Sequence, residues 1–554
     1  MGSQLVTTLA KLAALISVAA AQCRPRDYGW GSQVCVCNPE YCDFIGDVRP
    51  PQRGAVAAFE STKRGLRFAK TVLLREALGS DDINALQLVI NPSKTYQTIL
   101  GFGGAFTDAV GINLRTLPLG MQDDILRSYY SKQGIEYSTG RIPIASTDFS
   151  THKYTYDDIP GDVNLTNFRL APEDFHLKIP YIRRAMYLSS RPIWFFASSW
   201  SSPAWMKTNN AMDGLGFLRG SPGGPYYKIW ANYYVRFLQE YERQGIPIRG
   251  LTAQNEPTAG YIPFYRWQAL GFTAQTQKDF VKLDLGPALA KAGYGVDRVK
   301  VMIIDDNRII LRKWADVILG DREAAKYVSG VAVHWYMNRL IGPSVLDMVH
   351  QSFPDKFILA TEACAGYGLT TVNKVKLGSW ERAEYYASDI LGNLNHWATG
   401  WTDWNLVLNI RGGPNWARNF VDSPIIVNAT AQEFYKQPMY YAIGHFSKFI
   451  PPGSVRIDSR LIRAGLADLS TKLEYAAFLT PEQAIVVIVL NKSNSRYPLN
   501  IRDTHGSANA QKIINERSIT TFIWQPFGVK PQRPISVQGV KATQYGPAKG
   551  GVPL

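Results

Sequence analysis

Apolar and β-branched runs recur through the middle of the chain, and each run ends in polar or aromatic residues. Runs of this kind are typical of strands that are buried on both faces. Eight of them can be counted, and they end near Gly101–Gly104, Arg141–Ser146, Trp194–Ser198, Leu251–Asn255, Val301–Ile304, Val331–His334, Phe357–Ala360 and Gly400–Asp403. Stretches with helical spacing lie between them, for example Tyr226–Gln244 and Trp380–Ala398. The alternation predicts an α/β fold with a (β/α)₈ TIM barrel at residues 98–430.

The pattern changes after residue 430 to short alternating runs that are separated by Pro, Gly, Asn and Ser. Leu473–Leu479 and Ala484–Leu490 are two of these runs. They predict an accessory all-β, sandwich-like domain at residues 431–525. Leu86–Ile99 has the same character, so we expect residues 51–97 to supply strands that join this domain. Residues 526–554 are rich in Pro, Gly, Gln and Lys, which predicts a disordered tail.

The N-terminus has the pattern of a secretory signal peptide over residues 1–21. Its apolar run, Leu12–Ala21, ends in three alanines, as a cleavage site requires. The run is about half the ~20 residues that a membrane-spanning helix needs. Asn164, Asn428 and Asn491 each begin an Asn-x-Ser/Thr sequence, which predicts glycosylation during secretory transit.

Four of the five cysteines follow this signal directly, at Cys23, Cys35, Cys37 and Cys42. An oxidising lumen would pair them into two disulfides. Three pairings are possible, of which Cys23–Cys35 with Cys37–Cys42 nests most simply. Zinc binding is less favoured, because the segment has no histidine and no CxxC spacing. We therefore expect a small disulfide-bonded β segment at residues 22–50.

The net charge of +15 comes from 60 Lys and Arg against 45 Asp and Glu residues, and it is spread along the chain. Because the basic residues form no block, the chain is not expected to bind nucleic acid. A diffusely cationic, luminal protein suits a negatively charged membrane surface or another anionic partner. None of the seven histidines belongs to an HExxH or other metal-binding spacing, so we expect no metal and no other cofactor.

Two glutamates stand where apolar runs stop. Glu256 follows the fourth predicted strand, and Glu362 follows the seventh. Reactive residues of a TIM barrel lie at the C-terminal ends of its strands, so both should reach one rim. Two carboxyl groups that face each other perform glycoside hydrolysis, and a separation of about 5–5.5 Å is typical of enzymes that retain the anomeric configuration. We interpret the nearby Cys364 as a buried, unpaired thiol rather than a nucleophile.

Longer strings narrow the assignment. They are Gly101-Phe-Gly-Gly-Ala-Phe-Thr-Asp108, Thr402-Asp-Trp-Asn405, Gly412-Gly-Pro-Asn-Trp416, Arg418-Asn-Phe-Val-Asp-Ser-Pro424 and Gly444-His-Phe-Ser-Lys-Phe-Ile450. With Asn255-Glu256-Pro257, these strings resemble the animal lysosomal glucosylceramidases of glycoside hydrolase family 30. The resemblance runs from about Cys23 to Gln525.

The resemblance implies a role for ten residues. Glu362 would be the nucleophile and Glu256 the general acid/base. The ionised carboxylate attacks the anomeric carbon, while the protonated one donates to the leaving oxygen. The expected substrate-binding residues are Asp148, Trp200, Asn255, Trp404 and Asn419, and the expected supporting residues are Arg141, His334 and Tyr336.

The implied activity is cleavage of glucosylceramide to glucose and ceramide through a covalent glucosyl-enzyme intermediate. The implied location is the acidic lumen of the lysosome, with peripheral attachment to membrane. An anionic phospholipid surface and a saposin-type activator are the expected partners. Two alternatives stay open. One is a family relative that hydrolyses another β-glycoside, such as a β-xyloside or a β-1,6-glucan, and the other is a catalytically silent luminal protein that binds glycans or lipids.

Overall fold

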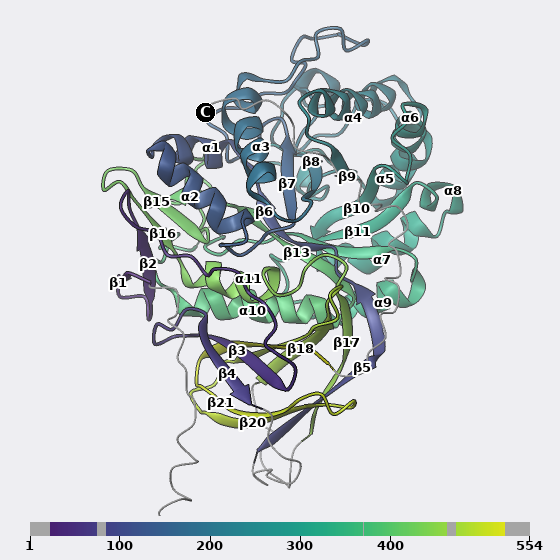
Figure 1. Cartoon of the computed structure of the whole chain (residues 1–554). Helices are drawn as coiled ribbons and strands as arrows, with labels where there is room; N and C mark the ends of the chain where they lie inside the picture. Colours follow the sequence, from purple (N-terminus) through teal and green to yellow (C-terminus); the bar gives the residue numbers. More distant parts are fainter. Residues whose placement is uncertain (1–22, 75–84, 369, 463–472, 527–554) are drawn as a thin grey trace, which may run out of the picture.

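The computed structural model describes residues 23–74, 85–368, 370–462 and 473–526. The predicted signal peptide and residues 527–554 of the predicted tail lie outside the described residues. The described strands form a closed barrel, a nine-stranded sheet and a five-stranded sheet (Figure 1).

Eight parallel strands close the barrel in the order in which they follow one another along the chain. They are β6 Gly101–Ala105, β7 Thr139–Ile144, β8 Trp194–Ser199, β9 Ile248–Thr252, β10 Lys300–Asn307, β11 Val328–His334, β12 Phe357–Glu362 and β13 Ala398–Asn405. Each contains or overlaps one of the apolar runs counted in the sequence, so the predicted TIM barrel is confirmed. In β12 every residue after Phe357 is buried, which explains why these strands show no alternation.

Helices cover the outside of the barrel and fill the space beneath it. They are α1 Asp108–Arg115, α2 Leu119–Tyr130, α3 Ile179–Leu188, α4 Pro225–Arg243, α5 Ala274–Phe280, α6 Gly286–Lys291, α7 Arg308–Leu319, α8 Arg322–Ala325, α9 Ser344–Ser352, α10 Trp380–Asn395 and α11 Pro438–Ser447. The two helices expected from spacing are confirmed as α4 and α10. Across the described part of the chain, no helix has both the length and the apolar character that crossing a membrane requires.

The nine-stranded sheet combines segments from both ends of the chain. Its strands, in spatial order, are β21 Asn509–Ile514, β20 Tyr497–Asp503, β5 Leu86–Thr98, β17 Val455–Ile462, β18 Leu473–Leu479, β19 Ile485–Asn491, β22 Ser518–Trp524, β3 Ala55–Thr62 and β4 Ala69–Leu74. β5 pairs with β17 and β20, and β3 pairs with β22. The predicted accessory all-β unit is confirmed.

Helices α10 and α11 lie between this sheet and the barrel (Figure 1). Arg517, the residue before β22, forms a bidentate ion pair with Glu384 on α10, and each of its two contacts is 2.6 Å long. Phe102 of β6 packs its ring against Phe446 of α11. These contacts pack the accessory sheet and the two helices against one end of the barrel. The loops that follow the strands form the rim at the other end.

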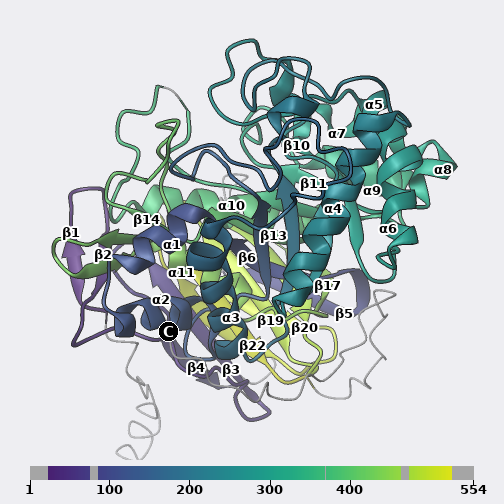
Figure 2. The ribbon, with the colours of Figure 1, turned by 90° about the horizontal axis from the view of Figure 1, so that it is seen from above.

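The five-stranded sheet holds the N-terminal segment. It contains β1 Pro25–Asp27, β2 Gln33–Cys37, β16 Glu433–Lys436, β15 Ile425–Asn428 and β14 Val407–Asn409. Disulfides join Cys23 to Cys35 and Cys37 to Cys42, which confirms the simplest of the three pairings. Figure 2 shows β1 and β2 on the opposite side of the molecule from α8.

The three predicted glycosylation sites differ in exposure. Asn164 is exposed and Asn428 is half-buried. Asn491 is fully buried, and its side-chain amide donates to the carbonyls of Ser495 and Asn515 at 2.8 Å each. A folded chain therefore does not present Asn491 to solvent.

Candidate active site

Glu256 and Glu362 meet at the C-terminal rim of the barrel. Glu362 is the last residue of β12, and Glu256 lies four residues after β9 ends at Thr252. One carboxylate oxygen from each glutamate and one ring nitrogen of His334 all lie within 4.8 Å of one another. The side chain of Glu362 is 7% exposed, whereas that of Glu256 is 17% exposed. Two carboxyl groups therefore face each other, one deeper than the other.

Positive φ angles in the backbone help to orient the side chains of this site. Glu256 has a left-handed φ of 39°, and its N–H donates to the carbonyl of Asp305 at 2.9 Å. Ile304 and Asp305 on β10 also have positive φ values, of 75° and 55°, where the register with β11 shifts. A non-glycine residue in this region costs about 1–3 kcal/mol, so the surrounding contacts must hold it there. The irregular β10 directs Asp305 into the site.

Glu362 is held by two donors. The guanidinium of Arg141 donates to its Oε2, and the hydroxyl of Tyr336 donates to its Oε1. Burial raises the pKa of Glu362 above its ordinary value, while the charges of His334 and Arg141 oppose this increase. Because both oxygens accept and neither is placed to donate, the contacts suit an ionised carboxylate.

Glu256 has different partners. His334 Nδ1 lies 3.1 Å from its Oε1, and the hydroxyl of Tyr265 donates to its Oε2 at 3.2 Å. Among the described contacts, neither oxygen accepts from a lysine or an arginine. The carboxyl group therefore lacks the strong guanidinium contact that Glu362 has.

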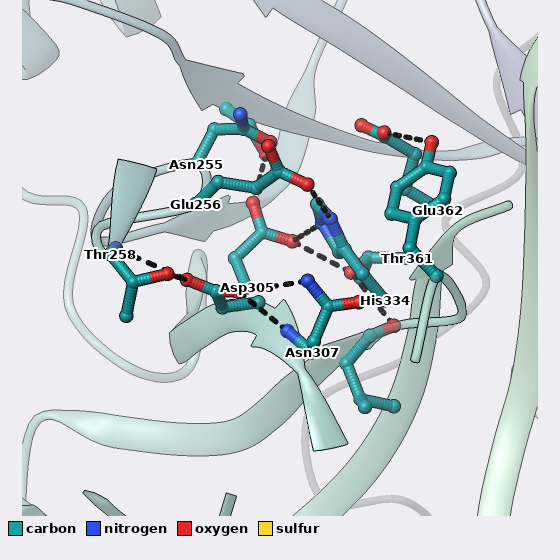
Figure 3. A network of polar contacts seen from close by, with 12 residues as sticks. Asn255, Glu256, Thr258, Asp305, Asn307, His334, Thr361 and Glu362 are labelled. Carbon is teal, nitrogen blue, oxygen red and sulfur yellow. Dashed lines mark hydrogen bonds and ion pairs between the residues drawn. The ribbon is translucent and has the colours of Figure 1, made fainter. Parts of the chain in front are cut away.

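Asp305 and His334 lie between the two glutamates (Figure 3). His334 Nε2 is 3.0 Å from Asp305 Oδ1, and Arg141 donates to Asp305 Oδ2 at 2.8 Å. Burial alone would lower the pKa of His334, but the charges of Glu362 and Asp305 raise it to about 10. Burial would likewise raise the pKa of Asp305, but Arg141 and His334 hold it below its usual range. The charges of Glu362 and Asp305 thus favour the protonated form of the buried His334.

The charges of this cluster can be counted. Arg141 and His334 supply two positive charges, and Asp305 and Glu362 supply two negative ones. A buried cluster is most stable when its charges balance. The charges of these four groups therefore balance among themselves. A metal ion would fit the spacing of Glu256, His334 and Glu362, but the cations already present disfavour it.

The sugar-binding candidates line the other side of the same rim. Asp148 Oδ2 accepts from the side-chain amides of Asn415 at 3.0 Å and Asn419 at 2.9 Å. Burial raises the pKa of Asp148 to about 7, although both amides lower it. Trp200 and Trp404 stack with ring centroids 5.0 Å apart. Indole rings together with a carboxylate and amides are the side chains that suit a pyranose ring and its hydroxyls.

All ten candidate residues come together. Arg141 donates to Asn255 Oδ1 at 2.8 Å and lies 5.0 and 5.5 Å from the ring centroids of Trp200 and Trp404. These contacts connect the residues around the glutamates to the tryptophans. Their roles stay predictions.

Asp305 and Asn415 belong to this site but are not among the residues predicted from the sequence. Asp305 was detectable, because the fifth apolar run ends in Ile303-Ile304-Asp305-Asp306 and the strand-end rule applies to it as well. Asn415 lies inside the Gly412–Trp416 string, but only its hydrogen bond to Asp148 shows that it belongs to the site.

Cys364 is free and buried, and its sulfur lies 3.5 Å from the hydroxyl of Tyr336.

Known proteins resemble the chain over most of its length. Residues 99–450 match the glycosyl hydrolase family 30 TIM-barrel domain, and residues 453–522 match the beta sandwich domain of that family. Lysosomal acid glucosylceramidase of Mus musculus is 47% identical over 507 residues, which cover 91% of this chain and 96% of the mouse protein.

Two solved structures share the fold and part of the sequence. SrfJ from Salmonella typhimurium has a TM-score of 0.75 and 28% identity, and covers 85% of this chain and 99% of its own. An endo-β1,6-glucanase has a TM-score of 0.74 and 25% identity, with the same two coverages of 85% and 99%.

Proposed function

The chain belongs to glycosyl hydrolase family 30, and we propose that it is a retaining β-glucosidase that hydrolyses glucosylceramide to glucose and ceramide. The observation that carries the proposal is the close approach of two carboxyl groups, within 4.8 Å at their nearest atoms, in unlike surroundings. Retaining enzymes place these groups about 5–5.5 Å apart, whereas inverting enzymes need about 6.5–9.5 Å to admit a water. The name of the mouse relative supports glucosylceramide as the substrate.

In the first step the Glu362 carboxylate attacks the anomeric carbon of glucose. The bond from that carbon to the ceramide oxygen breaks, and the proton of Glu256 goes to that oxygen. Arg141 and Tyr336 hold Glu362 in its ionised form and orient it for attack. The negative charge moves from Glu362, now an ester, to Glu256.

In the second step water attacks the anomeric carbon of the glucosyl ester. Glu256 takes a proton from this water, and the ester bond to Glu362 breaks, which restores both carboxyl groups. His334 lies against Glu256 and close to Glu362, so the same cation faces the negative charge in both steps. Asp148, Asn419, Trp200 and Trp404 would bind the glucose hydroxyls and ring.

We further propose that the rim meets an anionic phospholipid surface in the lysosomal lumen, with a saposin-type activator as partner. Exposed apolar side chains support this idea: Phe264 is 92% exposed after Glu256, Leu340 75% after His334, and Val372 90% after Glu362. All three lie on loops that follow barrel strands β9, β11 and β12. A net charge of +15 favours anionic lipid.

The test is glucose release from vesicles that contain glucosylceramide at about pH 5, with and without anionic phospholipid. We expect release from both kinds of vesicle and faster release with anionic lipid. No release from either would overturn the lipid assignment. Parallel assays with an aryl β-xyloside and a β-1,6-glucan test the first alternative, since faster turnover of either would favour it.

The second alternative is a catalytically silent binding protein. A mechanism-based fluoroglucoside should label the chain covalently at Glu362, because the ester forms faster than it is hydrolysed. Peptide mapping by mass spectrometry locates the label. An unlabelled protein that still binds glucosylceramide vesicles would support the silent alternative.

A further inference from the structure

A continuous line of buried contacts joins the two glutamates. It runs from Glu256 Oε1 to His334 Nδ1 at 3.1 Å, and from His334 Nε2 to Asp305 Oδ1 at 3.0 Å. Asp305 Oδ2 then accepts from Arg141, whose other nitrogen donates to Glu362. Asp305 touches neither glutamate through its side chain, yet it binds the partner of each.

Asp305 is itself held on every side. Thr361 donates to Oδ1 at 2.6 Å, and Ser198 donates to Oδ2 at 3.1 Å. Its side chain is fully buried, as is that of His334. A carboxylate that accepts four hydrogen bonds in a buried position is firmly ionised and cannot rotate away. The imidazole of His334 therefore faces a fixed negative charge at Nε2.

We propose that Asp305 is a positioning residue that keeps His334 an imidazolium throughout the reaction, so that whichever glutamate is ionised faces a fixed positive charge. The inference rests on the proposed function, because it concerns the two steps described there. With both ring nitrogens protonated, Nδ1–H always donates to Glu256 Oε1. The carboxyl proton of Glu256 must then sit on Oε2, from which it passes to the leaving oxygen.

The charged and titratable groups around His334 come from several barrel strands and the segments that follow them. They are Glu256 after β9, Asp305 and Asp306 on β10, Tyr336 after β11, Glu362 on β12, and Arg141 on β7, which reaches His334 through Asp305. The charge of Glu362, and the charge and hydrogen bond of Asp305, together oppose the effect of burial on the pKa of His334. Asp305→Asn would leave Glu362 as the main opposing charge, and we expect burial then to favour the neutral imidazole. The site would then lose a positive charge next to Glu362, whose pKa His334 now lowers.

The experiment compares the pH dependence of kcat/KM in wild type and Asp305→Asn, with an activated aryl β-glucoside as substrate. The acidic limb reports ionisation of the nucleophile in the free enzyme. If Asp305→Asn also removes the charge of His334, this limb should move to higher pH by about one unit. If His334 stays charged, only a negative charge is lost and the limb moves to lower pH. A lower or an unchanged limb overturns the proposal.

Asp306→Asn is the matched control. Asp306 is equally buried on the same strand, but its oxygens accept from Thr258 and Asn307 and not from His334. Removing it should not move the acidic limb to higher pH. An upward shift of the same size in this variant would mean that the effect of Asp305→Asn is not specific, and would overturn the proposal.

A second measurement observes the charge of His334 in the wild-type protein and uses a variant only to assign the signal. In wild-type protein labelled with ¹⁵N-histidine, one imidazole should keep both ring protons between about pH 5 and 8. Loss of that signal in His334→Gln assigns it. If His334 is neutral in this range, the proposal fails even when the enzyme hydrolyses glucosylceramide. If the imidazolium is present but no β-glucoside is hydrolysed, the proposed function fails instead.

Discussion

The Glu362 side and the Glu256 side of the site use the same functional group in opposite surroundings. Glu362 ends a buried strand and accepts from a guanidinium and a phenol. Glu256 is a loop residue with a strained backbone, and its side chain is more exposed. It contacts the phenol of Tyr265 and the imidazole of His334, which Asp305 holds in place. In the proposed mechanism the two carboxyl groups therefore differ in role because their donors and their depth differ, although the residue type is the same.

Removal of the Glu362 carboxylate should have the largest effect. Glu362→Gln cannot form the ester, so turnover of every β-glucoside should fall by about 10⁴-fold or more. Initial rates with aryl glucosides of different leaving groups measure this. Glu323→Gln is the control and should match wild type, because Glu323 is an exposed residue of helix α8. If Glu362→Gln still hydrolysed any of these aryl glucosides at a substantial rate, Glu362 could not be the nucleophile, and the proposed difference between the two sides would be wrong.

Glu256→Gln should discriminate between substrates. It removes the proton donor, so glucosides with poor leaving groups should lose about 10²–10⁴-fold in rate, while activated ones should still form the ester. Added azide should restore turnover of activated substrates, since it attacks the ester without a general base. Equal losses for all leaving groups, with no rescue by azide, would contradict the assignment of the two sides.

The two sides also differ in how far the sequence predicts them. The position of Glu362 follows from local patterning, because β12 is a regular strand and its apolar run stops at the reactive residue. The surroundings of Glu256 depend on the irregular end of β10, where Ile304 and Asp305 take positive φ values. Hydrophobic periodicity carries no signal for such a bulge. The role of Asp305 as a partner of His334 and Arg141 therefore appears only in the folded chain.

Tyr336→Phe probes the Glu362 side with a smaller change. The phenol donates directly to the attacking carboxylate, so its loss should slow ester formation by about 10-fold. The loss of a donor to the ionised form should also move the acidic limb of kcat/KM to higher pH. Stopped-flow measurement of leaving-group release gives the rate, and circular dichroism shows whether the variant folds as wild type does. A change in KM alone would contradict this role.

Tyr265→Phe is the counterpart on the Glu256 side and should have the smallest effect. Its hydroxyl contacts a partly exposed carboxyl group at 3.2 Å, and a bond of this kind contributes about 0.5–1 kcal/mol, or two- to five-fold in rate. The ring packs against Trp267 with centroids 4.6 Å apart, so phenylalanine should keep its place and the change tests the hydroxyl alone. The loss should be greatest for poor leaving groups, because only their departure needs the proton of Glu256. If Tyr265→Phe costs as much as Tyr336→Phe, and equally for all leaving groups, the two phenols are equivalent and the donors do not set the division of labour.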